Sequence, residues 1–284
     1  MRVACVGEAM IELAMAGEVP QLGVAGDTLN TAIYLKRAAP ALDVAYVTAL
    51  GDDPFSDRIA AFIAGEGLDT SRIARLTGQT PGLYAITTDA DGERSFTYWR
   101  STSAARQLFA DGYGALDGVD AVYLSGISLA ILPEGRRWEL LEQIKRRAIR
   151  LIFDSNYRPR LWESAEAART TVAAYWSAAD ICLPSLDDEM ALFEQDEEAV
   201  VARFQDLGAD GALKRGALGP LCLRGTVRQP YLAATEVIDT TAAGDSFNAG
   251  YLAAHWSGAG QAKALRAGHD LAMRVVAHRG AILP

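Results

Sequence analysis

Short apolar runs alternate along this chain with segments of helical periodicity. Most of the runs are almost continuously apolar, as expected for strands buried on both faces of a parallel sheet. They predict strands at 2–7, 44–50, 121–125, 150–154, 180–183 and 211–215. The alternation of such strands with helices predicts an α/β layered fold around a central, mostly parallel sheet flanked by helices.

Three segments between these strands have the spacing of amphipathic helices. They are 53–67, 136–149 and 163–178. In the first, Asp53 can cap the helix and Pro54 suits its first position. Gly65 and Gly67 then offer a place for it to end.

Residues 82–100 break this alternation, because they read as two strands joined across Asp91-Gly92, a strong hairpin signal. A two-residue turn there places Tyr98 opposite Ala85, so that Tyr84 and Tyr98 face opposite sides. Both tyrosines can face one ligand only if the turn is longer or a bulge intervenes. The hairpin is either a flap over a cleft or an amphipathic pair of strands packed on the core.

The segment 237–251, VIDTTAAGDSFNAGY, predicts a strand that ends at Val237 and Ile238 and a helix from about residue 245. Three small residues precede the helix: Ala242, Ala243 and Gly244. The first N–H groups of a helix are unpaired, and its dipole favours negative charge. Without bulky side chains, an anion can approach those groups, so the segment predicts a phosphate-binding anion hole.

Asp245 stands directly beside this predicted anion hole. One interpretation is a helix cap, a role that aspartate fills well. Capping alone does not require three small residues before it, and a carboxylate beside a phosphate repels it. A carboxylate that takes the proton of a hydroxyl attacking the phosphoryl group explains both features, so we favour a general base.

Composition and charge narrow the classes of function. The chain has 284 residues, 50% hydrophobic and 22% charged, which indicates one large domain or one domain with a small appendage. Its net charge of −9 argues against nucleic-acid binding. No segment approaches the roughly 18 apolar residues of a membrane span, and the first residues do not resemble a signal peptide, so we expect a cytoplasmic protein. The cysteines (Cys5, Cys182 and Cys222) read as buried, reduced thiols.

Signatures of other enzyme classes are missing from the sequence. It has no G-x-G-x-x-G turn after a strand, no P-loop, no G-x-S-x-G elbow and no H-E-x-x-H or Cys/His cluster. This argues against a dinucleotide dehydrogenase, a P-loop kinase, a serine hydrolase and a structural zinc site.

The segment VIDTTAAGDSFNAG resembles the C-terminal signature D-T-x-G-A-G-D of the ribokinase-like (PfkB-type) sugar kinases, with Ala242 where glycine is usual. Further segments resemble this family over most of the chain: 25–30, 51–57, 186–189 and 213–216. The first has Ala25 for a glycine, the second Ser56 for a glycine, and the third Leu186 for an asparagine. The resemblance implies a single ribokinase-like domain over 1–284, with a small β-sheet lid from about 9–25 and 80–102.

The resemblance also implies roles for individual residues and a need for ATP and Mg²⁺. Asp245 would be the base, and Ala242, Ala243 and Gly244 the anion hole that holds phosphate. The residues implied to hold the substrate are Gly26, Asp27, Asn30, Tyr84, Tyr98, Arg100, Arg158 and Asp245. Those implied to approach the nucleotide are Asn156, Lys214 and Gly216.

Metal roles and assembly are implied in the same way. Glu189 would act on magnesium indirectly. Asp239 and Thr241 match positions that hold a monovalent cation such as potassium in many relatives, although a strand end with a polar turn is the alternative. The partners implied are a small-molecule sugar acid and ATP, with a homo-oligomer formed through the lid.

Four stretches resemble the bacterial members of this family that act on 2-keto-3-deoxygluconate: PGLYAITTDADGERSFTYWR, YLSGISLAIL, FDSNYRPRLW and DTTAAGDSF. A sugar acid needs a cation for its carboxylate, and Arg100 and Arg158 can grip one with paired hydrogen bonds. The alternative for each is a surface or structural arginine. A kinase for a neutral ketose or nucleoside, and a non-catalytic sugar binder, remain competing functions; the intact Asp245 and Gly244 argue against the binder.

Overall fold

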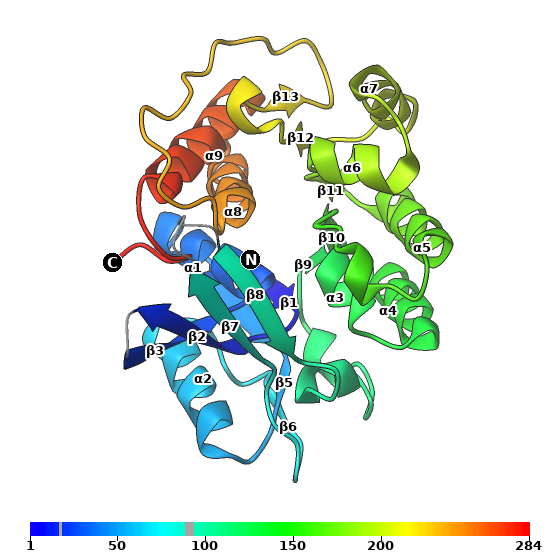
Figure 1. Ribbon diagram of the computed structural model, residues 1–284. Coiled ribbons are helices and arrows are strands. Elements are labelled where there is room, and N and C mark those ends of the chain that lie inside the picture. The colour runs from blue at the N-terminus through cyan, green and yellow to red at the C-terminus, as the bar shows by residue number, and fades with distance from the viewer. Residues whose placement is uncertain (17–18, 89–93) are drawn as a thin grey trace.

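The computed structural model of the protein describes residues 1–16, 19–88 and 94–284. At its centre lies a five-stranded parallel sheet with the strand order β11-β10-β9-β1-β4 (Figure 1). Its strands are β1 (Arg2–Val6), β4 (Asp43–Val47), β9 (Ala121–Ser125), β10 (Arg150–Asp154) and β11 (Ile181–Cys182). The predicted α/β fold around a parallel sheet is therefore confirmed.

Helices cover both faces of this sheet because alternate side chains of each strand enter two separate cores. Val3 and Cys5 of β1 enter one core, and Ala4 and Val6 enter the other. The first core is covered by α1 (Asp27–Ala38), α2 (Pro54–Gly65), α8 (Ala243–Trp256) and α9 (Gln261–Val276). The second lies under α3 (Gly126–Ala130), α4 (Glu134–Arg146), α5 (Ala165–Ala178), α6 (Leu186–Phe193) and α7 (Glu197–Asp206).

The three predicted helices are α2, α4 and α5. Asp53 caps α2 as expected, because its carboxylate accepts from the N–H groups of Phe55 (2.9 Å) and Ser56 (3.2 Å). The described residues also form four short 3₁₀ turns: η1 (Ala104–Gln107), η2 (Gly114–Leu116), η3 (Pro159–Leu161) and η4 (Gly216–Leu218).

Three strand predictions need correction. The run 44–50 is broken after Val47, and its end forms β5 (Ala49–Leu50), which pairs with β6 (Ala74–Arg75) in a separate sheet. The run 211–215 forms only β12 (Ala212–Leu213), which pairs with β13 (Leu221–Cys222). Val237 and Ile238 end no strand; both side chains are exposed, and the Ile238 N–H donates to the Val276 carbonyl.

A second, smaller sheet of four strands has the order β3-β2-β7-β8. The strands are β2 (Met10–Ala16), β3 (Val19–Ala25), β7 (Leu83–Thr88) and β8 (Arg94–Trp99). It is mixed, because β2 and β7 are parallel whereas its other two pairs are antiparallel. This separate small sheet confirms the predicted fold class.

The register of β7 and β8 corrects the predicted facing of the two tyrosines. Tyr84 pairs directly with Tyr98, and Thr88 pairs with Arg94. This register differs by one residue from the one that a two-residue turn would set, and Asp91-Gly92 itself lies outside the described residues. Because paired residues share a face, Tyr84 and Tyr98 point to the same side.

The three cysteines lie as the sequence predicts. Cys5, Cys182 and Cys222 are buried and free. Among the described residues, no helix combines the length and the apolar character that crossing a membrane demands.

Candidate active site

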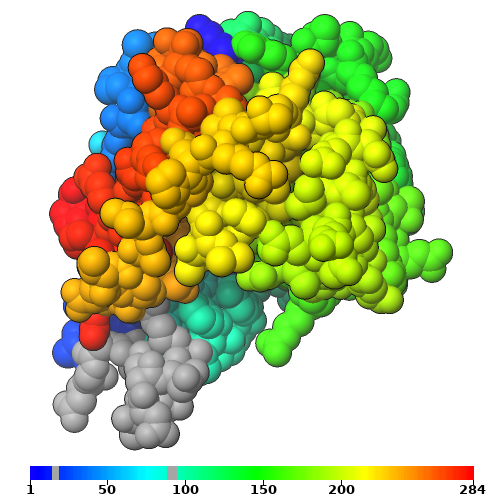
Figure 2. Space-filling model, turned by 90° about the horizontal axis from the view of Figure 1, so that it is seen from above, coloured from blue at the N-terminus to red at the C-terminus, as the bar shows by residue number. Residues whose placement is uncertain are grey.

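A cavity of about 1010 Å³ lies where the small sheet, the ends of the central strands and the start of α8 meet. In open α/β sheets, ligands collect at the carboxyl ends of the parallel strands. Seen from above, the segment that follows β12 crosses the molecule between the last two helices and the α5–α7 side (Figure 2). Residues of that segment, from Arg215 to Val237, contribute to the cavity wall.

The start of α8 has the geometry of an anion hole. Ala242 is the N-cap residue, with φ 61°, a left-handed conformation that glycine adopts without the steric strain of a Cβ. The helix begins at Ala243, so the next N–H groups, those of Gly244 and Asp245, belong to the first turn, which has no helical acceptors. All four residues line the cavity.

Asp245 is the third residue of α8 and does not cap it, because its side chain makes no bond to the helix start. Its carboxylate instead accepts a hydrogen bond from Asn30 Nδ2 of α1 (2.9 Å). Burial raises the pKa of this carboxyl above its usual range, and the charge of nearby Asp27 raises it further. The structure therefore excludes the capping interpretation and gives Asp245 the surroundings of a proton acceptor.

Gly26 and Asp27 begin α1 at the other side of the cavity. A Cβ on Gly26 would lie 2.3 Å from the Glu8 carbonyl oxygen, so only glycine fits there. The Asp27 carboxylate accepts from Asn156 Nδ2 (2.8 Å) and from the hydroxyl of Ser125. These contacts fix an acceptor at the cavity wall, where a sugar hydroxyl can reach it.

Aromatic rings of the small sheet close the cavity from one side. Tyr84 stacks on Tyr98 with 5.6 Å between ring centroids, and Phe96 stacks on Tyr98 at 6.4 Å. All three line the cavity. Tyr84 is buried and its hydroxyl donates to Glu12, whereas half of Tyr98 is exposed. The structure thus brings together the two tyrosines that the two-residue turn had separated.

Arg100 and Arg158 both line the cavity, and both are already paired with carboxylates. Arg100 is buried against Glu8, which is 1% exposed. Arg158 is half exposed and lies 3.4 Å from Asp188. A ligand carboxylate must therefore share each arginine with Glu8 or Asp188 or replace that partner. The sequence did not predict these two pairs.

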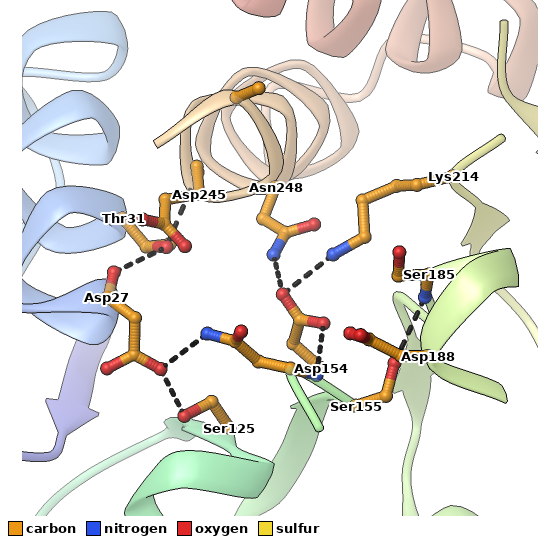
Figure 3. Close-up of polar contacts among 12 residues, drawn as sticks. Asp27, Thr31, Ser125, Asp154, Ser155, Ser185, Asp188, Lys214, Asp245 and Asn248 are labelled. Carbon is orange, nitrogen blue, oxygen red and sulfur yellow. Dashed lines mark hydrogen bonds and ion pairs between the residues drawn. The ribbon is translucent and has the colours of Figure 1, made fainter. Parts of the chain in front are cut away.

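Lys214 reaches into the cavity from the segment after β12 and meets a buried polar network (Figure 3). Its Nζ lies 2.7 Å from Asp154 Oδ2, and Asn248 Nδ2 of α8 donates to the same oxygen at 2.6 Å. The hydroxyl of Tyr123 lies 3.4 Å from it. Gly216, which begins η4 at φ 54°, also lines the cavity.

Glu189 does not line the cavity. It is fully buried behind the wall, where its carboxylate pairs with Arg203 at 2.7 Å and burial raises its pKa to about 7. Its neighbours Asp187 and Asp188 line the cavity instead. The described part of the chain holds no group of three or more His, Cys, Asp or Glu residues placed to bind a metal ion. Mg²⁺ usually binds through one or two carboxylates plus substrate phosphates, and Asp187 and Asp188 fit that mode.

Asp239 and Thr241 lie at the turn before α8. One Asp239 oxygen accepts from the N–H (3.0 Å) and the hydroxyl (2.6 Å) of Thr241, and the other accepts from the Gly280 N–H (2.9 Å). The Asp239 carboxylate thus ties the turn before α8 to the chain after α9.

Sequence reasoning missed three residues that line the cavity: Glu8, Asp154 and Asp188. It also missed Asn248, which is buried and donates a hydrogen bond to Asp154. A signal existed for Asp154, because it ends a predicted central strand, where ligand-binding side chains collect. Asn248 lies three residues after Asp245 and therefore on the same face of α8. Glu8 and Asp188 carried no comparable signal.

Comparisons with known proteins agree with this geometry. The family model described as "pfkB family carbohydrate kinase" matches residues 1–284. A 2-dehydro-3-deoxygluconokinase of Escherichia coli (strain K12) is 43% identical over 300 residues, covering 100% of this chain and 97% of the relative. The enzyme of the same name from Dickeya dadantii (strain 3937) is 44% identical, covering 99% of this chain and 96% of the relative.

The solved structures that resemble the chain support the same fold. A PfkB protein from Polaromonas sp. JS666 has a TM-score of 0.84 at 27% identity, covering 97% of this chain and 95% of the other. The resemblance inferred from the sequence motifs is thereby confirmed.

Proposed function

Because this chain belongs to the pfkB family of carbohydrate kinases, we propose that it transfers the γ-phosphoryl group of ATP to 2-keto-3-deoxygluconate (2-dehydro-3-deoxygluconate). The product would be 2-keto-3-deoxy-6-phosphogluconate. The observation that carries the proposal is the buried Asp245 carboxylate directly beside the open N–H groups of α8. The full-length identity to the two bacterial kinases supports the sugar acid as acceptor.

In the proposed step, the terminal hydroxyl oxygen of the sugar acid attacks the γ-phosphorus. The new O–P bond forms as the bond from the γ-phosphorus to its bridging oxygen breaks, and the electron pair stays with ADP. The hydroxyl proton passes to the carboxylate of Asp245. The N–H groups of Gly244 and Asp245 stabilise the charge on the transferred group.

Asp27 and Asn30 would hold and orient the sugar hydroxyls, and Asn30 also holds the base through its bond to Asp245. Tyr84 and Tyr98 would cover the sugar from the small sheet, which would act as a lid and exclude water. Arg100 and Arg158 would bind the sugar carboxylate. Gly216 and Asn156 would contribute to the nucleotide side of the site.

A coupled assay that follows ADP formation over a panel of sugar acids, neutral ketoses and nucleosides tests this function. We expect the highest kcat/KM for 2-keto-3-deoxygluconate. A higher value for a neutral ketose or nucleoside would favour another kinase of the family. No phosphorylation of any acceptor would favour the non-catalytic binder.

Asp187 and Asp188 would hold Mg²⁺, and the ion would supply positive charge that offsets the negative charge of the phosphates during transfer. We predict that Asp188→Asn raises the Mg²⁺ concentration needed for half-maximal rate more than Glu189→Gln does, because Asp188 lines the cavity and Glu189 lies behind it. Titrating the initial rate with Mg²⁺ at constant free ATP measures this. A rate that is unchanged by excess chelator would rule out a role for the metal. A larger increase in the required Mg²⁺ concentration for Glu189→Gln than for Asp188→Asn would assign the main role to Glu189.

The pH dependence of the reaction should report the raised pKa of Asp245. The base works only when deprotonated, so kcat/KM should fall as the pH drops through that raised pKa, well above the usual carboxyl range of about 4. Asp27→Asn should move this limb to lower pH, because Asp27 contributes to the increase. A limb that stays in place in Asp27→Asn would contradict this explanation, whatever the change in absolute rate.

Two further features follow from the family. Asp239 and Thr241 would take part in a site for a monovalent cation; replacing K⁺ by a bulky organic cation should then lower the rate. The small sheet exposes Leu22 and Trp99 on the face opposite to Tyr84, and these two side chains would belong to the contact of a homo-oligomer. Sedimentation analysis of Trp99→Ser against the unaltered protein tests that contact.

A further inference from the structure

The ammonium group of Lys214 lies against the start of α8. A Cβ built on Gly244 would come within 3.7 Å of Lys214 Nζ, so the ammonium faces the anion hole. The lysine side chain is only 11% exposed. Its backbone is fixed on both sides, because Lys214 N–H donates to the Pro184 carbonyl (2.8 Å) and Leu186 N–H donates to the Lys214 carbonyl (2.9 Å). The charge is therefore held beside the hole by the scaffold.

Asp154 determines where that ammonium rests. The Asp154 carboxylate is buried and also accepts from Asn248 of α8 and from the Asn156 N–H (3.2 Å). In Figure 3, Lys214 and Asn248 converge on Asp154, while Asp245 lies to the other side of α8's first turn. Without Asp154, the lysine could form an ion pair with the buried carboxylate of Asp245. Such a pair would lower the pKa of Asp245 and make it a weaker base.

On the strength of the function proposed above, we propose that Lys214 is a catalytic residue that stabilises the phosphoryl group in transfer, and that Asp154 and Asn248 are positioning residues that keep its ammonium off Asp245. The bonds that form and break are those of the step already described; Lys214 supplies charge and takes no proton.

Lys214 should act on the rate rather than on ATP affinity. In the resting site the ammonium is paired with Asp154. Any attraction between the ammonium and a bound phosphate therefore weakens this ion pair, and the net gain in binding free energy for ATP is small. During transfer, negative charge is spread over the oxygens of the group that lies in the hole. The ammonium is then attracted more strongly than in the ground state, and only such a difference raises kcat.

The first test replaces Lys214 by an uncharged side chain of similar length. Lys214→Met should lower kcat by about 10²- to 10³-fold, the effect of losing one preorganised donor at a developing charge, and leave the KM for ATP within about threefold. Lys214→Arg should recover part of the loss because it keeps the charge. Lys145→Met is the control, because Lys145 is an exposed lysine of α4 paired with Glu142.

The assay uses whichever acceptor of the panel the unaltered protein phosphorylates best, so failure of the sugar-acid assignment leaves this comparison decisive. A normal kcat with a raised KM for ATP in Lys214→Met would overturn the inference, because the lysine would then only bind the nucleotide. Equal changes in kcat for Lys145→Met and Lys214→Met would also overturn the inference.

The second test concerns Asp154 and reads the pH profile. The charged and titratable groups that face Asp245 are Asp27 and Tyr34 of α1, Tyr123 of β9, Asp154 of β10 and Lys214. Asp154→Asn should move the acidic limb of kcat/KM to lower pH and reduce the rate, because a negative charge is lost and the ammonium is free to approach Asp245. Adding Lys214→Met to Asp154→Asn should reverse part of this shift, because the ammonium that lowers the pKa of Asp245 is then absent.

A structural role alone would change stability without moving the limb. The positioning role of Asp154 would be overturned if the acidic limb of Asp154→Asn did not move. It would also be overturned if adding Lys214→Met did not bring the limb back towards that of the unaltered protein.

Discussion

Asp245→Asn should lower kcat by at least about 10²-fold and leave the protein folded, with an equal or higher melting temperature. The loss in rate is that of a positioned general base. Asparagine can still accept the hydrogen bond from Asn30, so the start of α8 should keep its geometry. A coupled kinase assay and a thermal melt on the same preparation measure both effects.

The direction of the stability change follows from the raised pKa of Asp245. Burial raises this pKa in the folded protein, so the ionised carboxylate reduces stability as the pH rises through it. Neutral asparagine avoids that unfavourable charge beside Asp27, and the gain should be larger at higher pH. Loss of activity together with equal or higher stability is the pattern expected when a functional residue is strained by its surroundings.

Asp206→Asn is the matched control, because Asp206 is exposed at the end of α7 and the change is chemically the same. Turnover of Asp245→Asn within a few-fold of the unaltered protein would mean that Asp245 only shapes the helix start. A strong fall in melting temperature would instead assign it a structural role.

The sequence was sufficient to predict the parallel sheet and the start of α8. Continuous apolar strands and helical spacing depend on local periodicity, which the chain displays directly. The open start of α8 was predictable because three small residues in a row and one aspartate have few structural reasons to occur together. In the structure, Ala242 at φ 61° and Asp245 as the third helical residue fill those positions.

Partners distant in sequence could not be predicted. Arg100 pairs with Glu8, and Glu189 pairs with Arg203, and neither pair leaves a pattern in the sequence. The facing of Tyr84 and Tyr98 depended on the register of β7 and β8, because a shift by one residue reverses every side chain of a strand. Such outcomes are decided by packing between elements rather than by local preference.

The largest expected change in specificity comes from Arg100, the buried cation at the end of β8. If it binds the carboxylate of 2-keto-3-deoxygluconate, removing it should lower kcat/KM for the sugar acid by about 10- to 150-fold. That range corresponds to roughly 1.5–3 kcal/mol for a hydrogen bond to a charged group. A neutral ketose has no carboxylate to lose, so its weak turnover should fall far less. The KM for ATP should hardly change.

The pairing of Arg100 with Glu8 requires care in the choice of variant. Arg100→Ala alone leaves the Glu8 carboxylate buried without its partner, and such a loss typically destabilises a protein by about 3–5 kcal/mol. The double variant Glu8→Gln/Arg100→Met removes both charges and keeps the volume, so it isolates the effect on the ligand. Glu8→Gln alone serves as the reference for that double variant.

Arg100→Lys keeps a positive charge beside Glu8 but cannot form the planar, two-bond grip of a guanidinium. It should therefore be more stable than Arg100→Ala and recover only part of the sugar-acid activity. The deciding quantity is the ratio of kcat/KM for 2-keto-3-deoxygluconate to that for a neutral ketose. If Arg100 reads the carboxylate, this ratio should fall in Glu8→Gln/Arg100→Met relative to Glu8→Gln and lie between the two in Arg100→Lys. If the ratio is the same in all three, Arg100 serves only to neutralise Glu8, and the exposed Arg158 becomes the remaining candidate for the carboxylate.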